Sequence, residues 1–255
     1  MANVDSKRRQ GQPCWIDLVT RDARAAARFY GAVLGWEFEV SGPEYGNYHL
    51  AKVGGRLAAG IGESDNEAFP SAWTVYFTAD DIAAMTAEAT RLGATVMMPA
   101  MKIPGQGHMA ILLDPTGAAF GLWQTIQHPG FQVRREPGAV SWFEVRTPDV
   151  EAAGRFYAAL LGATVATEEG TGSVFLTHGD DGGSIGGIER LSGDEPGARP
   201  HWATYFTVGD IEQALAAVTA NGGKMVRAAH ESPHGQLATA SDPYGAHFSL
   251  VQESA

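Results

Sequence analysis

The chain has 255 residues and a mass of 27.0 kDa, the size of two domains rather than one small domain. Hydrophobic residues make up 44% and charged residues 18%, which excludes a disordered chain. The net charge of −11 disfavours a nucleic-acid or membrane partner, and the single cysteine, Cys14, excludes an internal disulfide or a zinc finger.

The chain begins with a basic segment. Residues 1–12 contain Lys7, Arg8 and Arg9, but no apolar stretch follows that could form the core of a signal peptide. No run of about 18 apolar residues indicates a transmembrane helix. We therefore expect residues 1–12 to be a flexible tail and the protein to be cytoplasmic.

Two segments of the chain repeat one another. The 21 residues from Trp15 to Gly35 share 11 identities with those from Trp142 to Gly162. Further along, residues 73–82 match residues 202–211, and residues 114–120 match residues 242–248. The chain therefore contains the same domain twice.

Each half divides again into two similar modules. A short strand, an acidic residue that suits a helix start, and an amphipathic helix follow each of four tryptophans. The rest of each module consists of short strands separated by glycine-rich turns, so the sequence predicts four βαβββ modules and an α+β fold. The predicted units are modules 13–63 and 71–126 (domain 13–126), a linker at 127–138, and modules 139–190 and 200–252 (domain 139–252).

These modules resemble the vicinal oxygen chelate superfamily, which includes glyoxalases, extradiol dioxygenases and bleomycin and fosfomycin resistance proteins. The segments Arg28-Phe-Tyr-x-x-x-Leu-Gly-Trp36 and Asp114-Pro-Thr-Gly-Ala-Ala-Phe-Gly-Leu-Trp123 are similar to a two-domain actinobacterial subgroup of glyoxalase-like and hydroxylase-like proteins. The resemblance implies that two modules wrap their strands into a U-shaped sheet around a cavity. It also implies a small-molecule ligand, and some members of the subgroup are associated with the tailoring of antibiotics.

The same resemblance implies where a divalent metal would be bound. Its ligands, a His or Gln and a Glu, come from the first and last strands of the modules. None of the matching residues here is His, Gln or Glu, so we expect no cofactor, and metal-dependent glyoxalase or dioxygenase chemistry is not implied. The positions are Trp15, Thr74, Trp142 and Ala203 on first strands, and Gly121 and Ser249 on last strands.

Strand alternation indicates which side chains of the first half share the face of those positions. The predicted inner set combines aromatic walls with one carboxylate, which suits a planar organic ligand. Asp17 is the candidate acid–base residue, because an acid that faces inward is costly to bury unless it has a partner or a function. The alternative is that the aromatic residues fill a core. The ligand-binding candidates are Trp15, Thr74, Tyr76 and Trp123.

The inner face of the second half has a different chemistry. Glu144 or His247 is a candidate general base, with Tyr205 as a hydrogen-bond donor. Glu144, His201 and His247 could instead bind a metal, or Glu144 could pair with Arg146. The ligand-binding candidates here are Trp142, Arg146, His201 and Ser249.

The sequence thus favours a glyoxalase-like enzyme without the usual metal triad. It would act on a bulky, partly aromatic metabolite by rearrangement, hydration or hydroxylation. One alternative is a metal-free protein that sequesters a drug or metabolite, as bleomycin resistance proteins of similar fold do. A second is an atypical metal enzyme that uses the second-half pocket. Four modules supply two complete cavities, so either a monomer or a homodimer would serve.

Overall fold

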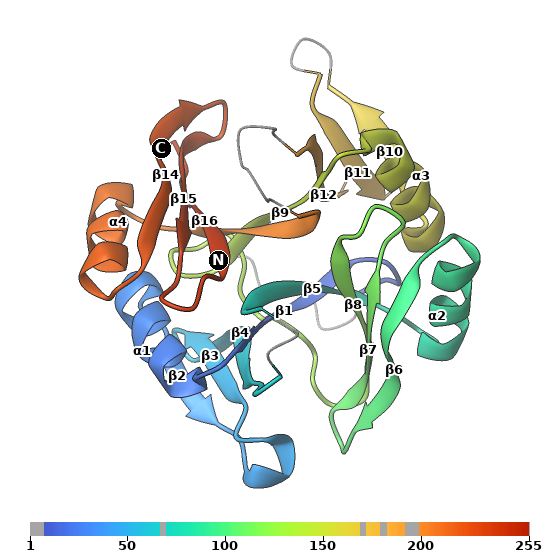
Figure 1. The fold of residues 1–255 in the computed structure, drawn as a ribbon, viewed down its shortest axis with the longest axis horizontal. Coiled ribbons are helices and arrows are strands. Elements are labelled where there is room, and N and C mark those ends of the chain that lie inside the picture. Colours follow the sequence, from blue (N-terminus) through green and yellow to red (C-terminus); the bar gives the residue numbers. More distant parts are fainter. Residues whose placement is uncertain (1–7, 67–69, 169–171, 179–182, 192–198, 255) are drawn as a thin grey trace.

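The computed structural model describes residues 8–66, 70–168, 172–178, 183–191 and 199–254. It contains two eight-stranded mixed sheets, one from each half of the chain (Figure 1). The first half comprises β1 (Pro13–Thr20), α1 (Ala23–Leu34), β2 (Glu37–Val40), the short helix η1 (Pro43–Tyr45), β3 (His49–Val53), β4 (Arg56–Glu63), β5 (Ala72–Thr78), α2 (Ile82–Arg91), β6 (Thr95–Ile103), β7 (Gly107–Leu113) and β8 (Ala119–Thr125).

The described residues of the second half repeat this order of α-helices and strands. They comprise β9 (Val140–Thr147), α3 (Val150–Leu161), β10 (Thr164–Thr167), β11 (Val174–His178), β12 (Gly183–Arg190), β13 (His201–Thr207), α4 (Ile211–Ala220), β14 (Lys224–Ser232), β15 (Gly235–Ser241) and β16 (His247–Gln252). The strand orders are β2-β3-β4-β1-β5-β8-β7-β6 and β10-β11-β12-β9-β13-β16-β15-β14. In each sheet two βαβββ modules therefore join through their first strands, which confirms the predicted α+β fold.

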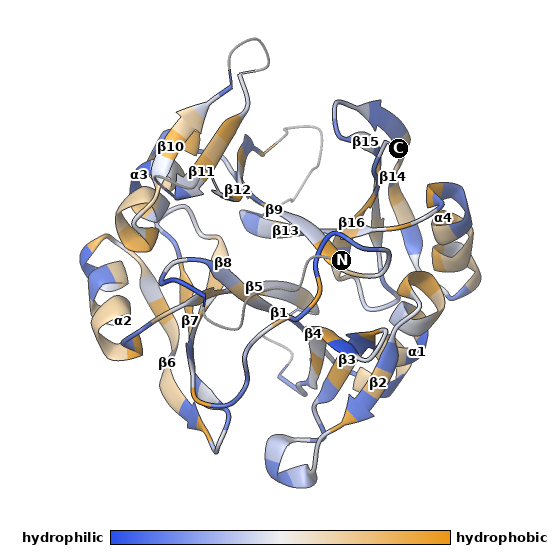
Figure 2. Cartoon of the chain, turned by 180° about the vertical axis from the view of Figure 1, so that it is seen from behind, coloured by the Kyte–Doolittle hydropathy of each residue, from blue (hydrophilic) through white to orange (hydrophobic). Residues whose placement is uncertain are grey.

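Each of the four α-helices in the described part of the chain begins after an acidic residue, as the sequence predicts. The side chains of Asp22, Asp81, Asp149 and Asp210 each accept hydrogen bonds from backbone N–H groups of the first turn, which would otherwise lack partners. Each helix is amphipathic (Figure 2). In α1, for example, Phe29 is buried and Arg28 is exposed. The buried faces fix each helix against its own sheet.

The two halves share one hydrophobic core. Figure 1 shows α1 beside α4 and α2 beside α3, and the central strand β5 contacts β13 and β16 of the other sheet. Aromatic rings meet across this boundary: Phe77 and Trp202 have centroids 5.3 Å apart, and those of Trp36 and Phe206 are 5.5 Å apart. The apolar outer faces of the sheets are therefore buried against each other.

Buried tyrosines on two helices tie the halves together with polar contacts. In the first half Trp73 Nε1 donates to the hydroxyl of Tyr30 at 3.0 Å, and that hydroxyl donates to Asp242 of the second half at 3.4 Å. In the second half Trp202 Nε1 donates to the hydroxyl of Tyr157 at 2.7 Å. These bonds satisfy donors that lie deep in the core.

The segment between the halves packs closely against both. Trp36 Nε1 donates to the carbonyl of Gly138 at 2.6 Å, and the guanidinium of Arg134 lies over the ring of Phe143. Part of the expected flexible tail is also held in place. The Arg8 guanidinium donates to carbonyls of this segment, and the N–H of Gly11 donates to the carbonyl of Thr78 at 2.8 Å. Residues 8–12 are therefore not loose, whereas residues 1–7 lie outside the described part.

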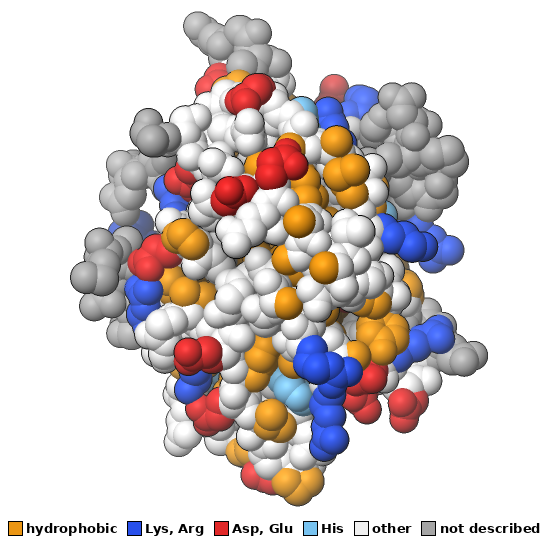
Figure 3. Space-filling view, turned by 90° about the vertical axis from the view of Figure 1, so that its left-hand side faces the viewer, with side chains coloured by type: hydrophobic (Ala, Val, Ile, Leu, Met, Phe, Trp, Pro, Cys, Tyr) orange, Lys and Arg blue, Asp and Glu red, His pale blue; other side chains and the backbone are white. Residues whose placement is uncertain are grey.

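The surface over α1 and α4 mixes residue types. Figure 3 shows hydrophobic side chains scattered among charged and polar ones on this face. Within the described residues, no helix is long and apolar enough to cross a membrane.

Candidate functional site

The first sheet encloses a cavity of about 550 Å³ on its inner face. A cavity of this volume accommodates a drug-sized organic molecule. Aliphatic side chains such as Met101 and Met109 form part of its wall, and the turn after β2 forms part of its rim. Its aromatic and titratable lining consists of Trp15, Asp17, Tyr48, Tyr76, Trp123 and His128, together with Glu39, Glu44, Tyr45 and Lys102.

Alternation along β1 and small residues on its neighbours position these groups. Ile16 is fully buried in the shared core, so Trp15 and Asp17 on either side of it face the cavity. A side chain at Gly121 of β8 would overlap the ring of Tyr76, and one at Gly60 of β4 would overlap Tyr48. The two glycines thus allow both phenol rings to lie against the sheet close to Asp17.

Asp17 lies at the centre of a hydrogen-bonded cluster. Its Oδ2 accepts hydrogen bonds from the hydroxyls of Tyr76 at 3.1 Å and Tyr48 at 3.3 Å. Trp15 Nε1 donates in turn to the Tyr48 hydroxyl at 2.9 Å. Oδ1 is buried and has no hydrogen-bond partner among the described residues.

The environment of Asp17 raises its pKa. Burial, which leaves 8% of the residue exposed, raises the pKa to about 7 despite the opposing effect of the two phenol donors. Because Oδ2 already accepts two hydrogen bonds, the proton of the neutral carboxyl is best placed on Oδ1. A carboxyl with a pKa near neutrality can give or take a proton at physiological pH.

His128 forms another wall of the cavity. Its ring lies edge-on to Trp15, with centroids 4.5 Å apart, and near Trp123 at 5.6 Å. Its Nδ1 accepts a hydrogen bond from the N–H of Gly130 at 3.0 Å. Burial lowers the pKa of His128 to about 4, so the imidazole is neutral at physiological pH.

In the second half Glu144 occupies the position that matches Asp17. It accepts a hydrogen bond from the Tyr205 hydroxyl at 2.9 Å and lies 3.3 Å from Nε of Arg146. Arg146 also contacts Glu189 at 3.3 Å. Burial and the nearby Glu189 carboxylate raise the pKa of Glu144, against the opposing effects of Arg146 and Tyr205. Glu144 is thus ion-paired, whereas the described neighbours of Asp17 are neutral.

The remaining predicted residues are placed as follows. The ring of Trp142 lies edge-on to that of Phe175, with centroids 6.0 Å apart. Ser249 is buried, and its hydroxyl oxygen lies 3.5 Å from that of Thr239. Thr74 pairs with Asp17 across β5 and β1. His201 begins β13, with Nδ1 2.8 Å from the carbonyl of Arg199, and His247 is exposed at the start of β16.

The residues at the metal positions implied by the resemblance do not fit a divalent metal. Gly121 has no room for a ligand side chain beneath Tyr76, and Trp15 directs its indole nitrogen to Tyr48. In the described part of the chain, no group of three or more His, Cys, Asp or Glu side chains is arranged to hold a metal ion. Glu144, His201 and His247 therefore do not form such a group.

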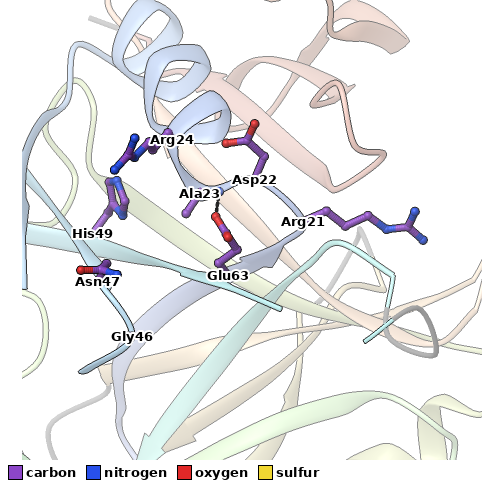
Figure 4. Close-up of a pocket in the computed structure, with 8 residues that line it drawn as sticks. All are labelled: Arg21, Asp22, Ala23, Arg24, Gly46, Asn47, His49 and Glu63. Carbon is purple, nitrogen blue, oxygen red and sulfur yellow. Dashed lines mark hydrogen bonds between the residues drawn. The ribbon is translucent and has the colours of Figure 1, made fainter. Parts of the chain in front are cut away.

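A second hollow of about 450 Å³ lies at the N-terminal end of α1 (Figure 4). Its lining is polar, with Arg24 and His49 on one side and two carboxylates on the other. Both carboxylates already accept hydrogen bonds from the first turn of α1. Asp22 accepts from the N–H of Ala25 at 2.8 Å, and Glu63 accepts from the N–H of Ala23 at 3.0 Å. The aromatic cavity is therefore the stronger candidate.

Sequence patterns did not point to two residues of the aromatic cavity. Tyr48 lies between β2 and β3, in a turn whose course strand alternation does not specify. The available signal was Gly60, which pairs with Asp17 on the neighbouring strand, because a glycine there leaves room for a bulky side chain. His128 lies in the segment interpreted as a linker, and its place beside Trp15 depends on tertiary packing.

Comparison with known proteins agrees with the geometry. A family model described as the Glyoxalase/Bleomycin resistance protein/Dioxygenase superfamily matches residues 139–250, and one for a glyoxalase-like domain matches residues 14–123. The chain is 35% identical over 256 residues to "Putative glyoxylase CFP32" of Mycobacterium tuberculosis, covering 97% of each chain. It is 34% identical over 259 residues to "Anthracycline biosynthesis protein DnrV" of Streptomyces peucetius, covering 95% of this chain and 93% of that one.

Solved structures show the same fold at low identity. A Mn(II)-bound glyoxalase from Novosphingobium aromaticivorans has a TM-score of 0.64 at 16% identity, covering 96% of this chain and 84% of its own. The 2,3-dioxygenase LapB from Pseudomonas sp. KL28 has a TM-score of 0.62 at 16% identity, covering 96% and 92%. Taken with the repeat, the paired modules and the full-length relatives, these matches show that the chain belongs to the Glyoxalase/Bleomycin resistance protein/Dioxygenase superfamily.

Proposed function

We propose that this protein is an enzyme that binds a bulky, partly aromatic metabolite in the first-half cavity and transfers a proton through Asp17. The observation that carries this proposal is a buried carboxyl, held by two phenols, in an aromatic cavity of about 550 Å³. The pKa of about 7 suits that carboxyl to act as general acid and general base in turn.

The relatives in anthracycline biosynthesis support the ligand class. Anthracyclines contain planar fused rings that carry carbonyl and hydroxyl groups. The walls formed by Trp15, Tyr76 and Trp123 match such a shape, because flat rings stack on indole and phenol faces. The side chains around the ligand would then contact both its ring faces and its oxygen-bearing edge.

The side chains of the cavity favour rearrangement or hydration over hydroxylation. A rearrangement through an enol needs a base that removes a proton from carbon and an acid that returns it elsewhere. A hydration needs a base for water and an acid for the accepting carbon or oxygen. Asp17 can serve these steps, whereas hydroxylation would also need an oxidant.

The proposal is tested by incubating the protein with an anthracycline aglycone in H₂O and in D₂O and following the aglycone by mass. We expect a mass change or incorporation of solvent deuterium. Asp17→Asn should lower the rate about a hundredfold or more, the usual contribution of a general acid–base group. Glu144→Gln, the matched change in the second half, should leave the rate within about threefold of the parent's.

Three results would contradict the proposal. If Glu144→Gln abolished turnover and Asp17→Asn did not, the active site would lie in the second half. Tight binding with an unchanged mass in both solvents would indicate the sequestration function, which the aromatic walls alone could perform. Absence of binding would exclude this ligand class.

A further inference from the structure

Two hydrogen bonds hold the backbone of His128, and a third holds its ring. Its N–H donates to the carbonyl of Gln106 at 3.1 Å, and its own carbonyl accepts from Trp123 Nε1 at 3.2 Å. The N–H of Gly130 donates to the ring nitrogen Nδ1. The ring therefore cannot turn without breaking a hydrogen bond of the partly buried backbone.

The third contact depends on a glycine. Gly130 has φ +84°, in the left-handed region, and a side chain there would overlap the carbonyl of Cys14. The same Cys14 carbonyl accepts the N–H of Phe131 at 2.9 Å, which fixes the turn against β1. The chain thus positions one N–H group beside Nδ1 of His128.

This contact determines the tautomer of the ring. A nitrogen that accepts a hydrogen bond carries no proton, so the neutral imidazole carries its proton on Nε2. Because its pKa is lowered to about 4, the ring keeps this form from about pH 5 upward. His128 is thus a neutral donor of fixed direction on the wall that it shares with Trp15 and Trp123.

We propose that His128 donates a hydrogen bond from Nε2 to a carbonyl or quinone oxygen of the ligand and so orients it against Asp17. This inference rests on the proposed function and names the ligand as a planar aromatic ketone or quinone. Trp15 connects the two groups, since its ring contacts His128 and its Nε1 donates to the Tyr48 hydroxyl that donates to Asp17. The neutral donor would also stabilise negative charge that develops on the oxygen as a proton is removed from a neighbouring atom.

The test uses 1,4-dihydroxyanthraquinone as the probe and measures its dissociation constant and its visible absorption band in the full-length protein. His128→Leu, which removes the donor and keeps an apolar side chain, should weaken binding about tenfold and shift the band of the bound probe toward that of the probe in an apolar solvent. His128→Gln, whose amide N–H reaches in a similar direction, should bind within about threefold of the parent. His234→Leu, on an exposed turn of the second half, is the matched control and should bind as the parent does.

The pH dependence separates a neutral donor from a charged one. In an Asp17→Asn background, where the acid of the same cavity cannot titrate, the ratio of the affinities without and with His128→Leu should be constant between about pH 6 and pH 8.5, because the ring does not titrate there. A ratio that grows as the pH falls through about 6.5 would indicate an imidazolium and would overturn the inference.

A measurement on the parent protein alone tests the inference even if the variants misfold. In ¹⁵N NMR of the parent protein, Nε2 of His128 should carry the proton and Nδ1 should not, and the reverse would overturn the inference. If the parent binds the probe, Asp17→Asn impairs turnover of the aglycone and His128→Leu binds as tightly as the parent, the role of His128 alone is wrong. If the parent turns over the aglycone but does not bind the probe, this inference alone is wrong. If it does neither, the proposed function is wrong as well.

Discussion

At the scale of the residue, the two halves place different environments around matching carboxylates. Asp17 accepts hydrogen bonds from two phenols, and its described contacts include no cation. Glu144 accepts from one phenol and pairs with Arg146, which also contacts Glu189. Val19 stands where the second half has Arg146, so Asp17 lacks the cation that in the second half opposes the rise in the pKa of Glu144. The repeat thus preserved the position of the acid while its chemistry diverged.

The raised pKa of Asp17 predicts a pH-dependent stability. Because the pKa in the folded protein (about 7) exceeds the ordinary value of 3.8, the native state keeps a proton that the unfolded state releases between these values. The contribution of Asp17 to the free energy of unfolding is therefore largest below about pH 4 and is lost as the pH rises to about 7. Asp17→Asn should gain stability relative to the parent between about pH 5 and pH 8, by an amount of the order of 2 kcal/mol.

Urea unfolding of both proteins at the two pH values measures this gain. Asp80→Asn, a change at an exposed acid before α2, serves as the control and should leave the pH dependence unchanged. An equal stability difference between parent and Asp17→Asn at both pH values would show that the Asp17 pKa is not raised.

How much of the site could be predicted varies from residue to residue. Alternation along one strand sufficed to predict that Trp15 and Asp17 share a face, because side-chain direction in a strand has a period of two. Tyr48 and His128 reach the same cavity from a turn and from the segment between the halves. No local periodicity sets the direction of such side chains, so the sequence alone did not place them.

At the scale of the element, α1 and α3, the first helix of each half, each place a tyrosine in the shared core. Tyr157 on α3 accepts from Trp202 Nε1. Burial of its phenol, and then the charge of Asp114 of the first half, raise the pKa of Tyr157 well above its ordinary value. Tyr30 on α1 makes the matching contacts with Trp73 and Asp242. Each helix is therefore anchored to both halves of the molecule.

Removing one hydroxyl from these contacts should destabilise the protein with little change in volume. Tyr157→Phe leaves the buried Nε1 of Trp202 without its acceptor, so we expect a loss of about 1–3 kcal/mol in the free energy of unfolding. Tyr244→Phe removes an exposed hydroxyl and should cost less than about 0.5 kcal/mol. Urea unfolding at neutral pH compares the two, and equal effects would show that the buried hydroxyl contributes no more than the exposed one.

The element scale is also where the sequence was most informative. The aspartates that precede the helices and the alternation of the first strands predicted the four modules, because capping and periodicity are local properties. The partners of the aromatic residues were not predictable in this way. A ring such as Phe77 is apolar whichever ring it meets, so its contact with Trp202 depends on how the two sheets pack.

At the scale of the whole molecule, the shared core makes the halves parts of one folding unit. Trp36 and Trp73 of the first half lie 5.5 and 5.3 Å from the ring of Phe206 in the second, measured between centroids. Phe206 is fully buried there. A defect at this boundary should therefore affect both halves at once.

Phe206→Ala tests this coupling. The change removes a large buried ring and should lower the free energy of unfolding by about 3–5 kcal/mol. Far-ultraviolet circular dichroism and tryptophan fluorescence should still report one coincident transition, because the halves unfold together. Two separate transitions, with one unaffected by the substitution, would show that the halves are independently stable domains.

The central claim is that Asp17 is a proton-transfer group inside a ligand cavity. The most direct measurement is a ¹³C NMR titration of the Asp17 carboxyl, assigned by its loss in Asp17→Asn, with and without 1,4-dihydroxyanthraquinone. We predict a titration midpoint near pH 7 in the free protein, and a midpoint that moves when the probe binds. A midpoint near pH 4 that does not respond to the probe would contradict the account.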